Sequence, residues 1–112
     1  EMWVKTTDAN PGVLFSQALS SGSNGRANFT VNNAASSKFA YYRRTDQRLV
    51  STTTVNDGTW HHLAVVKRGS GTNEIELYVD GLLEDTGTDT GDIHEAANTE
   101  LGRFNGDFFD GF

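Results

Sequence analysis

Two carboxylates, Glu74 and Glu76, stand two residues apart in a segment where apolar and polar residues alternate. Alternation over residues 74–80 predicts a half-buried strand, which places both carboxylates on one face. Two carboxyl groups about 5–5.5 Å apart are the arrangement that retaining glycoside hydrolysis requires. The competing interpretation is an ordinary polar strand face in contact with water. We favour that interpretation, with Tyr78 on the same face.

The histidines offer a second kind of chemistry, that of a metal ligand or a general base. His61 and His62 are adjacent in a strand-like segment, so their side chains should point to opposite faces and cannot bind one metal ion together. For both residues we favour a structural interpretation, and we expect His94, in a loop, to be exposed. The absence of cysteine excludes disulfides, cysteine-based zinc sites and a thiol nucleophile.

Length and charge narrow the class of protein. The chain has 112 residues, the length of one domain, and a net charge of −6. A negative surface repels phosphate backbones, so nucleic acid is not an expected partner, whereas Ca²⁺ is compatible with it. The sequence contains no run of 18 apolar residues, so it predicts no membrane span. Because the chain begins directly on strand-like residues, we expect its N-terminus to be cut, and the missing signal peptide carries no weight.

The elements that must position these residues are strands. Twelve glycines and one proline, with no sustained helical period, predict an all-β protein of short strands and tight turns. Asp57-Gly58, Asp80-Gly81 and Asn105-Gly106 predict turns, the last two within hairpins. The longest loop is expected at 86–98. Strands are expected at 1–6, 12–18, 26–31, 38–43, 47–54, 60–68, 74–80, 82–86, 99–104 and 107–112.

Four segments in this order carry a family resemblance: 57–66 (DGTWHHLAVV), 77–81 (LYVDG), 101–103 (LGR) and 109–111 (FDG). Together with the early Met2-Trp3-Val4-Lys5 segment, they resemble the laminin-G-like and pentraxin-like branch of the concanavalin A-like lectin/glucanase superfamily. The resemblance covers nearly the whole chain. It implies a jelly-roll sandwich of two antiparallel sheets.

The chain departs from the family pattern at both of its ends. Family members have a strand before the Trp-Val-Lys strand and a final strand after Phe-Asp-Gly. We therefore expect residues 1–112 to form a single, truncated domain that lacks terminal strands and self-associates through exposed edges. Related glucanases carry a Glu-x-Asp-x-Glu or Glu-x-Asp-x-x-Glu strand, whereas the corresponding positions here include Glu76 and Tyr78. Because the carboxylate pattern is incomplete, we do not expect an enzyme.

Many family members hold Ca²⁺ at the rim of the sandwich, so Ca²⁺ is the candidate cofactor. No EF-hand spacing is present, and a site would have to be assembled from separate loops. Asp57 and Asp110 are equally well explained as turn residues, and Asp80 is assigned to its turn. The acids in loops are Asp57, Asp89, Asp92, Asp107 and Asp110. Asp92 and Asp107 are the candidate metal ligands.

The resemblance implies a non-catalytic recognition or adhesion module of an extracellular or cell-surface protein. Its expected partner is a glycan or an extracellular protein. Tyr42, Arg44 and Tyr78 are the candidate ligand-binding residues, whereas Trp3 and Trp60 are expected in the core. The alternatives are a structural or protein–protein interaction domain and, third, a degenerate glycoside hydrolase domain.

Overall fold

The computed structural model describes residues 1–18, 27–31, 37–43, 46–90, 98–104 and 107–108. All regular structure in this part of the chain is β, and no described segment forms a helix that could cross a membrane. The strands are β1 (Met2–Lys5), β2 (Gly12–Ala18), β3 (Ala27–Val31), β4 (Lys38–Arg43), β5 (Asp46–Thr54), β6 (Trp60–Lys67), β7 (Ile75–Val79), β8 (Leu82–Gly87), β9 (Asn98–Leu101), β10 (Arg103–Phe104) and β11 (Asp107–Phe108).

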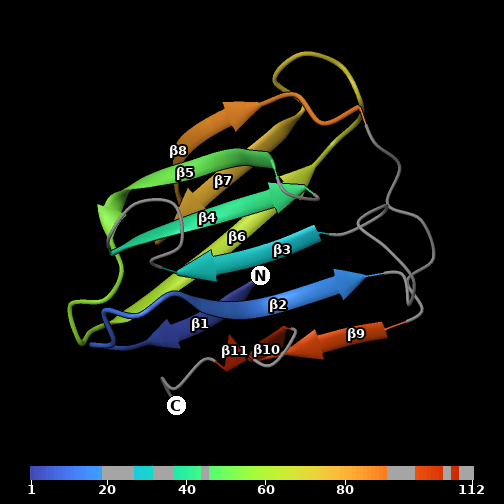
Figure 1. Cartoon of the computed structure of the whole chain (residues 1–112). Helices are drawn as coiled ribbons and strands as arrows, with labels where there is room; N and C mark the ends of the chain where they lie inside the picture. The colour runs from blue at the N-terminus through green and yellow to red at the C-terminus, as the bar shows by residue number, and fades with distance from the viewer. Residues whose placement is uncertain (19–26, 32–36, 44–45, 91–97, 105–106, 109–112) are drawn as a thin grey trace.

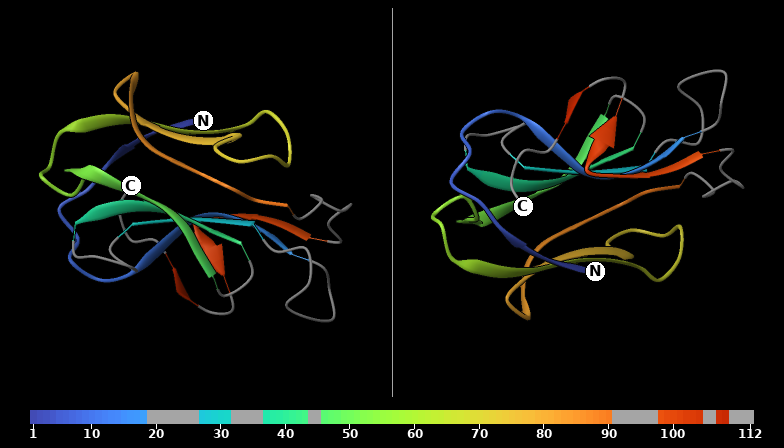
Figure 2. Two further views of the ribbon diagram at one scale, coloured as in Figure 1. Left: turned by 90° about the horizontal axis from the view of Figure 1, so that it is seen from above. Right: turned by 90° about the horizontal axis from the view of Figure 1, so that it is seen from below.

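The strands form two main antiparallel sheets. One sheet has the order β1-β6-β7-β8, and the other has the order β5-β4-β3-β2-β9. Seen from above and below, the sheets form two facing layers (Figure 2). A short ladder of β10 and β11 follows β9 and lies near β2 (Figure 1). The all-β, two-sheet antiparallel sandwich that the sequence predicts is confirmed.

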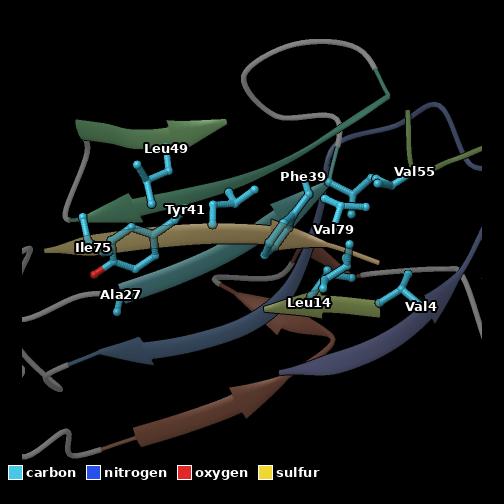
Figure 3. Packing of buried hydrophobic residues seen from close by; sticks show 12 residues of the cluster. Val4, Leu14, Ala27, Phe39, Tyr41, Leu49, Val55, Ile75 and Val79 are labelled. Atoms are coloured by element: carbon cyan, nitrogen blue, oxygen red, sulfur yellow. The ribbon is translucent and has the colours of Figure 1, made fainter. Parts of the chain in front are cut away.

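The core lies between the two sheets because alternate residues of facing strands turn inward. From the four-stranded sheet come Leu63, Leu77 and their apolar neighbours, and from the five-stranded sheet come Phe39 and Leu49. Figure 3 shows side chains of this core between the ribbons, with Phe39 and Leu49 among those labelled. Full burial of one such side chain contributes about 1.5–3 kcal/mol. The buried cluster is Val4, Leu14, Ala27, Val31, Phe39, Tyr41, Leu49, Val55, Leu63, Ile75, Leu77 and Val79.

The turn between β7 and β8 is built by Asp80 and Gly81. Their φ angles are 52° and 80°, the left-handed values that both central residues of a type I′ hairpin turn require. Val79 pairs with Leu82 on either side, so the turn has two residues. The hairpin predicted from Asp-Gly is confirmed.

One lateral side of the sandwich is joined by carboxylates of β8. Glu84 Oε2 accepts hydrogen bonds from the backbone N–H groups of Thr52 and Thr53 at 2.9 and 3.1 Å. Asp85 Oδ2 accepts one from the N–H of Val50 at 2.9 Å. These donors lie on β5, the edge strand of the other sheet. The carboxylates therefore satisfy edge N–H groups of β5 that would otherwise be open to another strand.

The two tryptophans are not in the core, and that expectation was wrong. Trp3 is 63% exposed and Trp60 is 62% exposed. The reason is the phase of each strand. In β1 it is Val4 that points inward, and in β6 it is Leu63, so the tryptophans point outward.

The C-terminal strands also differ in detail from the expectation. The predicted strand 99–104 is divided at Gly102, whose φ of 66° turns the chain from β9 into β10. β10 pairs with β11 across residues 105–106, as the Asn-Gly signal predicts. Of the predicted strand 107–112, residues 107–108 form β11, and 109–112 lie outside the described residues.

Candidate functional site

Aromatic side chains gather on the face of the four-stranded sheet that is turned away from the core. We call Trp3, Trp60, His62 and Tyr78 the outer aromatic face. Trp3 comes from β1, Trp60 and His62 come from β6, and Tyr78 comes from β7. The face follows from alternation, since each of these residues is next in sequence to one that points inward.

The register brings these side chains close to one another. Trp3 pairs with His62 across β1 and β6, and their ring centroids are 5.2 Å apart at an interplanar angle of 50°. Lys5 pairs with Trp60 on the same face. Trp60 is thus a diagonal neighbour of Trp3, a position within reach of long side chains. The buried Ala64 is next to both His62 and Tyr78 on this face. It follows His62 by two residues on β6, and it pairs with Tyr78 on β7.

A hydrogen-bonded group borders this face. The Tyr78 hydroxyl donates to Glu76 Oε2 at 2.7 Å. Arg68 donates to the same oxygen from Nε and Nη2 at 3.0 and 2.9 Å. Bonds from Arg68 and then Tyr78 lower the pKa of Glu76, which keeps it ionised. Glu76 therefore fixes the position of the Tyr78 ring.

Glu74 and Glu76 each form hydrogen bonds with neighbouring groups of the domain. Glu74 accepts a hydrogen bond from the backbone N–H of Gly71, within its own turn. Glu76 is the acceptor for Arg68 and Tyr78. Each carboxylate has a local structural role, and a general acid would need a raised pKa, not the lowered pKa of Glu76.

A second cluster surrounds the buried His61 at the start of β6. Its Nδ1 lies 2.8 Å from Asp80 Oδ2, and its Nε2 lies 3.2 Å from Asp57 Oδ1. Asp80 Oδ1 also accepts a hydrogen bond from the N–H of His62 at 2.8 Å. His61 therefore joins the Asp57-Gly58 turn to the β7–β8 turn. Its side chain points inward and that of His62 points outward, as alternation predicts.

The pKa values of this cluster follow from these contacts. Burial lowers the pKa of His61, but bonds and charges from Asp80 and Asp57 outweigh it, and the net pKa is raised. Bonds from the Thr59 hydroxyl and N–H, and then from His61, lower the pKa of Asp57 to about 2. The bond from His61 lowers the pKa of Asp80. In weak acid, the favoured state therefore has a protonated His61 between the ionised Asp57 and Asp80.

Thr59, His61 and Asp80 form a series of hydroxyl, imidazole and carboxylate, the order used in nucleophilic catalysis. Thr59 Oγ1 lies 3.2 Å from His61 Nε2. The same hydroxyl donates to Asp57 Oδ1 at 2.7 Å, and Asp57 also contacts Nε2. Asp57 therefore contacts both the hydroxyl and the imidazole, and the arrangement supports the turn.

A third polar cluster lies inside the sandwich. Asp89 is only 2% exposed and accepts a hydrogen bond at 3.0 Å from the hydroxyl of the buried Tyr41. Lys67 Nζ donates to the backbone oxygen of Asp89 at 2.7 Å and lies 3.6 Å from its carboxylate. Burial, and then the charge of Asp89, raises the pKa of Tyr41. Asp89 follows β8 in a loop, as the sequence predicts, but its side chain is buried.

The predicted ligand-binding residues do not meet in one place. Tyr78 belongs to the outer aromatic face. Tyr42 lies in β4 next to the inward-pointing Tyr41, so it faces away from the core on the opposite sheet. Arg44 lies outside the described residues. Sequence reasoning missed Trp3, Trp60 and His62 as candidate site residues. If Val4 and Leu63 are taken as inward-pointing, strand alternation turns these three side chains outward.

The candidate calcium ligands have little structural description. Asp92 lies outside the described residues, and the structure describes the backbone of Asp107 in β11 but not its side chain. Among the residues that are described, no group of three His, Asp or Glu side chains could hold a metal ion. The calcium site at Asp92 and Asp107 stays a prediction.

The fold is a two-sheet antiparallel β-sandwich, and comparison with known proteins gives its family. A laminin-G family model, described as the Concanavalin A-like lectin/glucanases superfamily, matches residues 1–112. The chain therefore belongs to this superfamily, as a laminin-G-like domain. Domains of this class typically act as extracellular recognition or adhesion modules. No solved structure matches the chain significantly.

One similar curated protein is a rat protein, "Sushi, von Willebrand factor type A, EGF and pentraxin domain-containing protein 1". It is 31% identical over 87 residues, which are 77% of this chain. The match covers 2% of that protein's own length, so the similarity concerns a small part of it.

Proposed function

We propose that this chain is a non-catalytic carbohydrate-recognition module and that it binds glycans on the outer aromatic face. The observation that carries the proposal is the exposure of both tryptophans of the chain on one face of one sheet. Large exposed aromatic side chains are enriched where proteins bind ligands, because they offer contact area with little loss of conformational freedom.

The arrangement of this face suits a sugar better than an apolar partner. The rings are interspersed with polar side chains, Lys5 beside Trp60 and the Arg68–Glu76 pair beside Tyr78. A sugar offers an apolar C–H face for ring contact and hydroxyls at its rim for hydrogen bonds. Protein interfaces, by contrast, have an apolar centre depleted in charge. An extracellular location, as part of a larger protein, accompanies this proposal.

A glycan array with matched variants tests the proposal. We expect Trp3→Ala and Trp60→Ala each to weaken binding at least about tenfold, the effect of removing an aromatic contact residue. Tyr42→Ala is the matched control, because it removes an aromatic ring from the opposite sheet, and it should leave binding unchanged. Circular dichroism of each variant verifies that the fold is retained.

Three outcomes would contradict the proposal. Loss of binding in Tyr42→Ala alone would move the site to the five-stranded sheet. An absence of glycan binding, with capture of a protein ligand that needs Trp3, would make the face a protein-binding site. Turnover of β-glucan oligosaccharides that Glu74→Gln abolishes would restore the hydrolase interpretation.

A further inference from the structure

The outer aromatic face is longer than one sugar ring. Its aromatic side chains stand at two ends, with Trp3 and Trp60 at one end and Tyr78 at the other. Tyr78 pairs with Ala64 on the neighbouring strand β6. Trp3 pairs with His62, two residues before Ala64 on β6. With strands about 4.8 Å apart and a rise of about 3.4 Å per residue, the Cα atoms of Trp3 and Tyr78 are about 12 Å apart, and those of Trp60 and Tyr78 about 14 Å. One sugar ring therefore cannot contact both ends.

A small side chain lies between the two ends. Ala64 is on the outer side of β6, because Leu63 and Val65 on either side of it pack toward the core. It is nevertheless buried, since the larger side chains of His62 and Tyr78 lie beside it. A small residue at this position lets a ligand lie along the face without a side chain projecting into its path.

The charges on this face favour a neutral ligand. At the Tyr78 end, Arg68 Nη2 lies 2.9 Å from Glu76 Oε2, so the two charges compensate each other. The Arg68 side chain is still 61% exposed and can donate hydrogen bonds to sugar hydroxyls. At the other end, Lys5 adds one positive charge beside Trp60, whereas the chain as a whole has a net charge of −6. A ligand with many negative charges would be repelled by this protein.

We propose that the outer aromatic face binds a neutral, unbranched oligosaccharide along its length. One sugar contacts the Trp3–Trp60 end, and a later sugar of the same chain contacts Tyr78. This inference rests on the proposed function, because it names the class of glycan that the same face takes. A terminal sugar recognised by itself would use one end of the face and leave the other without a role.

Calorimetry with fragments of increasing length tests this inference. The probes are fragments of one to about six sugars, with the repeating unit of the glycan that binds most tightly on the array. Affinity should rise at least about tenfold from the single sugar to the fragment that spans both ends, and it should then level off. Equal Kd values at all lengths would overturn this inference but not the proposed function, whereas an array with no bound glycan would remove both.

Tyr78→Ala separates the two ends of the face. It should weaken binding of the longest fragment at least about tenfold, and binding of the disaccharide less than about twofold, because the disaccharide occupies the larger rings of Trp3 and Trp60. Tyr42→Ala is the matched control, since it removes a tyrosine from the opposite sheet, and it should leave binding unchanged at every length. Equal weakening of short and long fragments by Tyr78→Ala would overturn the inference. If that variant does not fold, the length series of the wild type still decides.

Salt dependence tests the neutral character of the glycan. The Kd of the longest fragment should change by less than about twofold between about 50 and about 500 mM NaCl, since no ion pair with the glycan is formed. A fragment of the same length that carries uronic acids should bind no more tightly. A larger rise of Kd with salt, or tighter binding of the acidic fragment, would overturn the assignment to neutral chains.

Discussion

At the scale of single residues, the structure gives buried polar groups the task of joining turns and strands that are distant in sequence. His61 links Asp57 to Asp80, and Asp89 links Tyr41 to Lys67. Buried polar groups are stable only with hydrogen-bond partners, and these clusters supply them. The sequence alone indicated a structural role for His61 but could not place Asp89 inside, because its partner Tyr41 lies 48 residues away.

The His61 cluster predicts a particular dependence of stability on pH. The folded-state pKa of His61 is raised above its ordinary value of 6.5, so its stabilisation is complete below pH 6.5 and lost as pH rises through the raised value. The pKa of Asp57 is about 2 against an ordinary 3.8, so its stabilisation is present above pH 3.8 and lost as pH falls toward 2. The cluster therefore contributes most between about pH 4 and 6.5.

His61→Gln tests this dependence, because glutamine keeps hydrogen-bonding groups but cannot take the charge. Urea unfolding should show a loss of about 1–2 kcal/mol at pH 5 and a smaller loss at pH 9. Asp80→Asn, which retains a residue suited to the turn, should reduce the pH dependence in the same direction. Equal losses at both pH values would show that the ion pairs of His61 contribute nothing.

The calcium prediction also belongs to single residues. If Asp92 and Asp107 bind Ca²⁺, millimolar Ca²⁺ should raise the melting temperature relative to EDTA. Saturation at about a hundred times Kd is worth about 2.7 kcal/mol, or roughly 10 °C for a domain of this size. Asp92→Asn and Asp107→Asn should each remove the rise. An unchanged melting temperature for the wild type would count against the site.

At the scale of elements, most strands could be predicted to within a residue or two. Period-two alternation and the Asp-Gly turns fix where strands such as β7 and β8 begin and end. What the pattern did not give was the direction in which Trp3 and Trp60 point. The residue type suggested that both tryptophans are buried. They are exposed because Val4 and Leu63 are the residues that point inward in their strands. The candidate face was missed for that reason.

The β7–β8 turn offers a direct test of element chemistry. Gly81 has a φ of 80°, and a Cβ added there would meet no atom within 4 Å. Gly81→Ala should therefore destabilise the domain by about 1–2 kcal/mol through backbone strain alone, measured by urea unfolding. Gly81→Asn should cost less, because asparagine tolerates the left-handed region. Equal effects of the two substitutions would contradict this explanation.

At the scale of the whole molecule, Glu84 and Asp85 join the two sheets along one lateral side, whereas on the other side β1 pairs only with β6 among the described strands. Its two outward faces also differ, since both tryptophans stand on the four-stranded sheet. Family membership explains the fold but not the ligand, because one fold serves many binding functions. The side chains on the outer aromatic face are therefore what the proposed function rests on.

The most direct measurement of that function is tryptophan fluorescence during titration with a glycan identified on the array. Trp3 and Trp60 are the two tryptophans of the chain, and both belong to the proposed face. Binding there should change the emission saturably and protect both rings from acrylamide quenching, with the same Kd that calorimetry gives. Calorimetric binding that leaves emission and quenching unchanged would show that the glycan binds elsewhere and would contradict the account.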